Sequence, residues 1–205
     1  MNKRATCPNC EYILARCLCN SLQKIDNKTQ IIILQHPRES SHALNTARLM
    51  TKSFLKIKLF IGEDFSDHEE LNELIKTNKE SIALIFPKVG SPILTSEMVH
   101  ISHLIFIDGT WKKARKIYLL SKNLTDLPTY SLETLKESQY KIRSSEFSKG
   151  LSTLEASLLV LGKIEKHLET ISLEETFLKM INFQIEKMGE ETYRKNYEKK
   201  NKSEE

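Results

Sequence analysis

The chain has 205 residues, of which 40% are hydrophobic and 28% charged, with only 6 Gly and 5 Pro. This length and composition predict one folded unit with a real core and exclude disordered and fibrous proteins. Its apolar runs, such as 31–34 and 104–107, are far shorter than the roughly 20 residues that span a bilayer. The first residues are polar or cysteine rather than the apolar core of a signal peptide, so we expect a cytoplasmic protein with no membrane partner.

The formal net charge is only +4, but the charges are unevenly distributed. Residues 1–60 and 101–150 are rich in Lys and Arg, residues 61–100 are acidic, and residues 151–205 are nearly balanced. If the fold joins the two basic blocks, their common face would attract phosphates, as in nucleic-acid-binding proteins. The alternative is an ordinary solvated surface with uneven charge.

All four cysteines, Cys7, Cys10, Cys17 and Cys19, lie close to the N-terminus. Their spacing is C-x2-C-x6-C-x-C, and the leading Cys-Pro-Asn-Cys is a knuckle that lets two thiolates reach one tetrahedral Zn²⁺. Disulfides are the alternative, which a reducing cytoplasm disfavours. Four sulfur ligands complete the coordination shell, so we predict a structural zinc site without a position for substrate.

After the knuckle, short apolar runs alternate with segments of helical periodicity. We expect strands at 30–35, 56–61, 81–86 and 103–107, with a further short strand at 139–143. We expect helices at 43–55, 67–76 and 111–120, then one helix carrying Leu154, Leu158, Leu161 and Leu168 and another carrying Phe177, Ile181, Ile185 and Met188. This alternation predicts an α/β fold with a mostly parallel sheet.

Three of the predicted strands end at segments that are candidates for the functional site. In open α/β sheets ligands bind beyond the carboxyl ends of the strands, which makes 36–39, 86–87 and 108–111 the candidate segments. The last contains a carboxylate, a glycine, a hydroxyl and the only tryptophan, and leads into the basic run 112–116. We interpret it as a small-molecule pocket beside a cationic helix. The alternative makes Asp108 a helix N-cap and Trp111 a core anchor.

The segment Asp108-Gly109-Thr110-Trp111, followed by Ala114-Arg115, resembles the D-x-T-W signature of the DTW-domain proteins, the tRNA-uridine aminocarboxypropyltransferases. The resemblance covers roughly residues 7 to 160. Its other motifs are the cysteine knuckle, Gln35–Glu39 with Asn45–Arg48, Phe86-Pro87, Tyr140–Arg143 and Leu151–Ala156. The chain departs from the family at Tyr12-Ile13, where an arginine-proline pair is expected.

The resemblance implies transfer of the 3-amino-3-carboxypropyl group of S-adenosylmethionine to N3 of a tRNA uridine. The products are acp3U and methylthioadenosine. It also implies a SPOUT-like, Rossmannoid parallel sheet with a deep trefoil knot. We therefore expect a zinc-binding segment at 1–24, a DTW catalytic domain at 25–188 and a flexible charged tail at 189–205.

This chemistry needs a donor held with Cγ facing the nucleophile and a base for the N3 proton of uridine. We expect a catalytic group of Asp108, Thr110 and Trp111, in which Asp108 is the base or, alternatively, a ligand of the donor. The expected donor-binding residues are these three with Phe86, Pro87, Leu151, Ser152, Thr153, Glu155 and Ala156.

Ser152-x-x-Glu155 is also the pattern of a helix capping box, and both roles are compatible. The expected tRNA-binding cations, which would contact phosphates, are Arg38, Lys112, Lys113, Arg115 and Arg143. Two other functions fit the sequence. One is an RNA methyltransferase using the same donor, and the other is a non-catalytic, zinc-dependent RNA-binding module.

Overall fold

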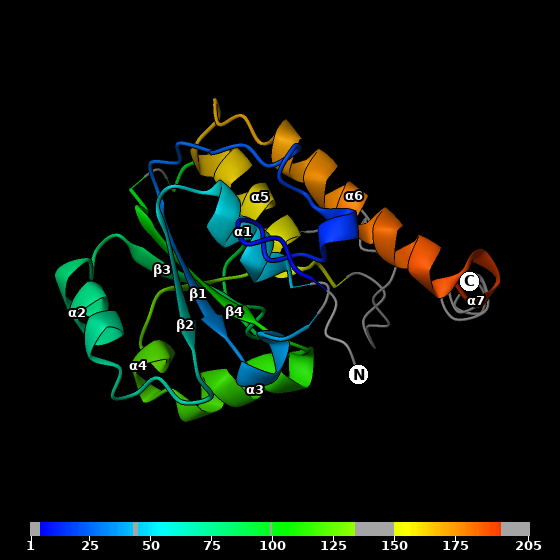
Figure 1. The fold of residues 1–205 in the computed structure, drawn as a ribbon. Helices are drawn as coiled ribbons and strands as arrows, with labels where there is room; N and C mark the ends of the chain where they lie inside the picture. The colour runs from blue at the N-terminus through cyan, green and yellow to red at the C-terminus, as the bar shows by residue number, and fades with distance from the viewer. Residues whose placement is uncertain (1–4, 43–44, 99, 134–149, 194–205) are drawn as a thin grey trace, which may run out of the picture.

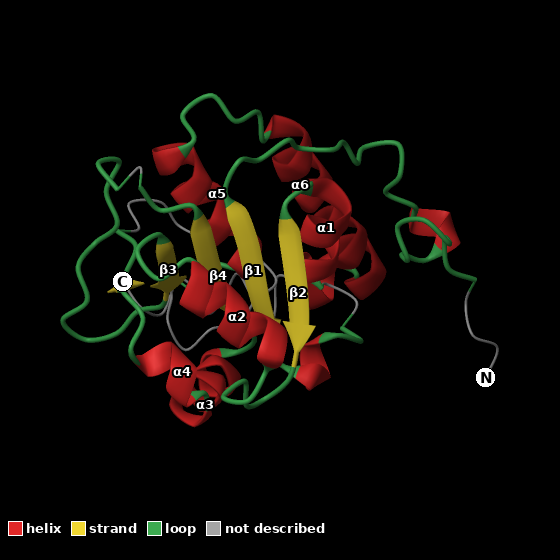
Figure 2. Cartoon of the chain, turned by 90° about the vertical axis from the view of Figure 1, so that its left-hand side faces the viewer, coloured by secondary structure: helices red, strands yellow, loops and turns green. Residues whose placement is uncertain are grey.

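The computed structural model describes residues 5–42, 45–98, 100–133 and 150–193. They form a five-stranded sheet with helices on both faces (Figures 1 and 2). The strands are β1 (Gln30–Gln35), β2 (Ile57–Ile61), β3 (Ile82–Ile85), β4 (His103–Asp108) and β5 (Thr129–Tyr130). Their order is β2-β1-β4-β3-β5 and every neighbouring pair is parallel, which confirms the expected α/β class and parallel sheet.

Seven α-helices and two short 3-10 helices lie within the described residues. They are η1 (Leu14–Arg16), η2 (Pro37–Glu39), α1 (Thr46–Ser53), α2 (Glu69–Thr77), α3 (Trp111–Leu120), α4 (Lys122–Thr125), α5 (Thr153–Ile164), α6 (Ile171–Met188) and α7 (Glu190–Tyr193). None of these helices is both long and apolar enough to cross a membrane. The strand expected at 139–143 lies outside the described residues.

Alternate residues of each strand belong to two separate apolar clusters. Ile31 and Ile33 of β1 lie in the cluster that includes α1, α5 and α6, whereas Ile32 and Leu34 lie in the cluster with α2, α3 and α4. Figure 1 shows these two groups of helices on opposite sides of the sheet. Because both faces are buried, the strands are continuous apolar runs rather than alternating ones.

The helix ends differ from the sequence prediction for local reasons. Helix α1 begins at Thr46, since the Asn45 side chain accepts a hydrogen bond from the Arg48 amide and so caps it. Helix α5 ends at Ile164, and Leu168 lies outside it. Its C-cap residue, Glu165, accepts hydrogen bonds from the amides that precede β1.

The cysteine segment is packed into the main core rather than set apart from it. Cys10, Tyr12 and Leu18 are buried in the same cluster as α1, α5 and α6. The Thr176 hydroxyl of α6 donates to the main-chain oxygen of Ser21 at 2.7 Å. Figure 1 shows this N-terminal segment lying against α1 and α6.

The strand order reverses between β1 and β4. The chain moves outward from β1 to β2, while β3 and β5 lie on the other side of β4. The parallel register pairs Gln35, the last residue of β1, with Asp108, the last residue of β4. Such a switch point opens a crevice at the carboxyl edge of the sheet, which is where ligands bind in folds of this type.

Candidate active site and metal centre

Asp108 is fixed at the switch point by three neighbouring elements. Its carboxylate Oδ2 accepts a hydrogen bond from Gln35 Nε2 of β1 at 2.8 Å. Its Oδ1 accepts one from the Thr153 hydroxyl of α5 at 2.5 Å. Its main-chain oxygen accepts one from the His36 amide at 3.0 Å. Asp108 is 9% exposed, so the carboxylate is nearly enclosed and its orientation is set.

Gln35 connects Asp108 to the start of α1. The same Nε2 also donates to Asn45 Oδ1 at 3.1 Å. Asn45 Nδ2 in turn donates to the main-chain oxygens of Glu39 and Ser40. Both Gln35 and Asn45 are buried. Both residues lie in motifs quoted in the sequence analysis, but neither was predicted to belong to the site. The signal that could have identified Gln35 is a glutamine at the end of an apolar strand.

The two structural alternatives for the signature segment are wrong. Thr110, not Asp108, is the N-cap residue of α3, and its side chain makes no capping hydrogen bond. Trp111 is half-buried and belongs to neither apolar cluster of the described residues. Gly109 packs closely on α3, since a Cβ there would lie 3.1 Å from Lys113 Cβ and one of the two would have to shift by a few tenths of an ångström.

The predicted capping box is present at the start of α5. Ser152 Oγ accepts from the Glu155 amide at 3.2 Å, and Glu155 Oε2 accepts from the Ser152 amide at 2.8 Å. Ser152 is 1% exposed. The cap fixes the first residue of the helix, Thr153, whose hydroxyl contacts Asp108. Leu151 and Ala156 are half-buried beside it.

Phe86 and Pro87 follow the carboxyl end of β3, next to β4. The Phe86 ring stacks on Tyr118 of α3, with centroids 4.8 Å apart. Pro87 is exposed. The carboxyl edge of the sheet thus brings together residues after β1, β3 and β4, as the sequence prediction required.

Two lysines of α3 form ion pairs with carboxylates of neighbouring segments. Lys113 forms an ion pair with Glu39 at 2.6 Å, and Lys116 forms one with Glu63 at 2.5 Å. The Lys116 ammonium, followed by His36, holds the pKa of the Glu63 carboxyl below its usual range.

Of the expected RNA-binding residues, Arg38, Lys112 and Arg115 are exposed. Lys113 is half-buried and forms an ion pair with Glu39 of the same chain. Arg143 lies outside the described residues.

His36 supports the loop after β1 and holds a single tautomer. Its Nδ1 accepts from the Arg38 amide at 3.2 Å, so the ring hydrogen is on Nε2, which donates to Glu63 at 2.7 Å. The imidazole is buried. It thereby links β1 to the segment after β2 at the edge of the sheet.

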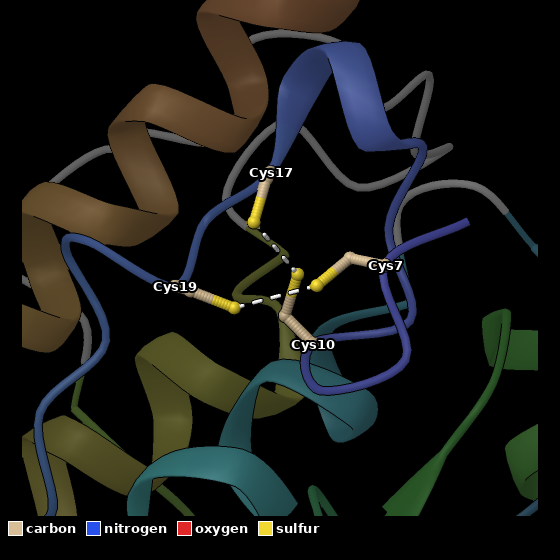
Figure 3. A group of neighbouring side chains, drawn as sticks. All are labelled: Cys7, Cys10, Cys17 and Cys19. Atoms are coloured by element: carbon tan, nitrogen blue, oxygen red, sulfur yellow. Dashed lines mark hydrogen bonds between the residues drawn. The ribbon is translucent and has the colours of Figure 1, made fainter. Parts of the chain in front are cut away.

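The four cysteine sulfurs converge on one point (Figure 3). All lie within 4.8 Å of one another, with Cys7 and Cys19 at 3.5 Å and Cys10 and Cys17 at 3.7 Å. A Zn–S bond of about 2.3 Å places the corners of a tetrahedron about 3.8 Å apart, which is close to the separations of the Cys7–Cys19 and Cys10–Cys17 pairs. A disulfide would need about 2.05 Å, and the cysteines are free.

The environment of the sulfurs also suits a cation. Hydrogen bonds from the amides of Cys10 and Asn9 lower the pKa of Cys7 to about 6. Hydrogen bonds with Cys17 and Cys7 raise the pKa of Cys19 to about 12, because the Cys19 thiol keeps its proton as a donor to these neighbours. A dication at the centre would favour the thiolate form of these cysteines, and the four sulfurs are close enough together to hold one metal ion.

The fold and site define an α/β protein with an enclosed carboxylate at the switch point of a parallel sheet. Residues 4–185 match the DTW domain, and the chain belongs to this family.

Three curated relatives are each named "tRNA-uridine aminocarboxypropyltransferase 2". The chain is 31% identical to the one from Drosophila melanogaster over 82% of its own length and 70% of the relative. It is 28% identical to those of Mus musculus and Macaca fascicularis, over 90% and 80% of its own length. It spans only 65% and 58% of those two relatives. No solved structure matches the chain.

Proposed function

We propose that this chain is an S-adenosylmethionine-dependent tRNA-uridine aminocarboxypropyltransferase that forms acp3U. The observation that carries the proposal is the position of Asp108, the first residue of the DTW signature, held at the switch point by Gln35 and Thr153. The names of the curated relatives support the same activity.

In the proposed reaction uridine N3 attacks Cγ of the donor's aminocarboxypropyl group. The Cγ–S bond breaks, its electron pair goes to sulfur, and methylthioadenosine leaves without protonation. The N3 proton passes to Asp108, whose two carboxylate oxygens retain lone pairs beyond the two hydrogen bonds they accept. A positioned base contributes about 10²- to 10⁴-fold, and alignment of the two reactants contributes further. The other role considered for Asp108 is to bind the donor.

The donor is proposed to lie over the carboxyl edge of the sheet. Thr110 and Trp111 would border it on one side and Phe86 with Pro87 on the other. Leu151, Ser152, Thr153, Glu155 and Ala156 would contribute main-chain groups from the start of α5. The capping box supports this arrangement, because it fixes the loop that would line the pocket.

The tRNA is proposed to bind along the exposed cations near this edge, Arg38, Lys112 and Arg115, together with Arg143. Lys113 would contribute less, because it is paired with Glu39. Zinc is proposed as a structural ion held by the four cysteines. A SPOUT-like knotted topology is proposed as well, supported by the all-parallel sheet and by α5 beginning beside the end of β4. The proposed division remains a zinc-binding segment at 1–24, a catalytic domain at 25–188 and a charged tail at 189–205, in a cytoplasmic protein.

The test is mass spectrometry of nucleosides after incubation of unmodified tRNA with the protein and S-adenosylmethionine. The proposal expects acp3U. Methylated nucleosides would instead identify an RNA methyltransferase, and unmodified tRNA that is nevertheless bound would identify a non-catalytic RNA-binding module.

A further inference from the structure

We propose that Gln35 is a positioning residue that holds the Asp108 carboxylate in its reactive orientation. This inference rests on the proposed function, in which Asp108 takes part in the transfer. It concerns a side chain that is 1% exposed and lies beneath the candidate site, so Gln35 would act through Asp108 rather than by contact with the substrate.

The orientation of the Gln35 amide is determined by its neighbours. The Arg48 amide can only donate, and it donates to Asn45 Oδ1 at 2.9 Å. That atom is therefore an acceptor, so Gln35 must direct its NH₂ group toward it. The same NH₂ group faces Asp108 Oδ2 at 2.8 Å. Turning the amide over would set its carbonyl oxygen against both acceptors, so only one orientation is favourable.

This arrangement leaves Gln35 Oε1 buried without a hydrogen-bond partner among the described residues. A buried carbonyl without a partner is unfavourable, and native proteins contain few of them. An apolar side chain of similar length would fill the same position without that cost. An apolar residue cannot supply an N–H donor to Asp108. The need for this donor accounts for a glutamine at the end of an apolar strand.

Loss of this donor would leave Thr153 as the one donor to the Asp108 carboxylate among the described residues. The carboxylate could then rotate about its own side-chain bonds, and misplacement of a reacting group by about 1 Å can cost about 100-fold in rate. We therefore expect Gln35→Met to lower kcat about 10- to 100-fold. Its thermal midpoint should fall by only a few degrees, because the loss of a donor to the enclosed carboxylate is partly offset by removal of the unpartnered oxygen.

Gln30→Met is the matched control. Gln30 lies at the opposite end of the same strand and is half-buried, and its side chain donates to the main-chain oxygen of Ile31. This variant should retain the wild-type kcat. An active wild type with unchanged kcat in Gln35→Met would overturn the inference, whereas an inactive wild type would instead contradict the proposed function.

A second variant separates positioning from simple structural support. Gln35→Glu keeps the shape but places a second carboxylate beside Asp108, and only its protonated form can donate a hydrogen bond. Positioning predicts that the ratio of variant to wild-type kcat rises as the pH falls. A ratio independent of pH would overturn the inference, and so would a ratio that only follows the pH dependence of the variant's thermal midpoint.

A measurement independent of turnover uses protein labelled with ¹³C at the aspartate carboxyls. The Asp108 resonance, assigned by its absence in Asp108→Asn, should move in Gln35→Met and stay in place in Gln30→Met. An Asp108 resonance unchanged by Gln35→Met would contradict the inference even if the enzyme proved inactive.

Discussion

Each oxygen of the Asp108 carboxylate accepts from a different kind of donor. The Gln35 amide can only donate to it, whereas the Thr153 hydroxyl can either donate or accept. An asparagine at 108 can therefore keep both contacts, with its oxygen toward Gln35 and its NH₂ group toward Thr153. We expect Asp108→Asn to lower the free energy of unfolding by less than about 1 kcal/mol, measured by urea denaturation.

The same substitution should remove the base. Transfer is expected to fall by about two to four orders of magnitude with donor affinity largely unchanged, and part of the rate should return as the pH is raised. Single-turnover rates and donor titrations check this. Parallel loss of donor affinity and rate, without recovery at alkaline pH, would instead assign Asp108 to donor binding.

Ser152 has a measurable structural role through its cap. Ser152→Ala removes the acceptor for the Glu155 amide and is expected to cost about 1 kcal/mol of unfolding free energy. Thr170→Ala is the matched control, since Thr170 is the N-cap residue of α6 but makes no capping hydrogen bond. The free energies of unfolding that the two variants lose, measured with a denaturant, should differ by about that amount. Equal losses would contradict the assigned cap.

At the scale of elements, the two groups of cations on α3 should bind tRNA differently. Lys112 and Arg115 are exposed, whereas Lys113 and Lys116 are paired with Glu39 and Glu63. Replacing the exposed pair with Ala should lower the slope of log affinity against log salt by about 1.4 to 1.8, at roughly 0.7 to 0.9 per phosphate contact.

The double substitution of Lys113 and Lys116 by Ala should change this slope by less than half as much. Filter-binding measurements over a salt series give both slopes. A larger effect from the ion-paired lysines would place the tRNA on a different side of the helix.

The cysteine segment should lose its packing when the metal is removed. We expect about one zinc per chain by metal analysis. Chelation should lower the thermal midpoint by about 5 to 10 °C, because Cys10, Tyr12 and Leu18 share the main core with α1 and α6. Added zinc should restore it. A Cys17→Ser variant with full metal content would contradict the ligand set.

Elements that are specified by their own residues were predicted well, whereas those that depend on contacts with distant residues were not. Strand β1 has the predicted ends, since an apolar run between polar residues specifies it locally. Strand β5 was missed, because two residues carry no periodicity and only the pairing with β3 creates it. The end of α5 was misplaced because Glu165 binds amides distant in sequence, at Lys28 and Thr29.

At the scale of the whole molecule, the general position of the candidate site followed from the sequence. Parallel strands end at one edge, so the residues that follow β1, β3 and β4 were the candidates for this site. Their partners were not predictable, because Gln35 reaches Asp108 only when β1 and β4 become neighbours in the sheet. The pairing of Lys113 with Glu39 likewise depends on the folded loop after β1.

The central claim is that Asp108, held at the switch point, promotes transfer of the aminocarboxypropyl group to tRNA. Its most direct test is the small-molecule product of the reaction, quantified by chromatography with and without tRNA. Wild-type protein should release methylthioadenosine in amounts equal to the acp3U formed and only when tRNA is present, and Asp108→Asn should release far less. Release of S-adenosylhomocysteine, or equal methylthioadenosine from the wild type and the variant, would contradict the account.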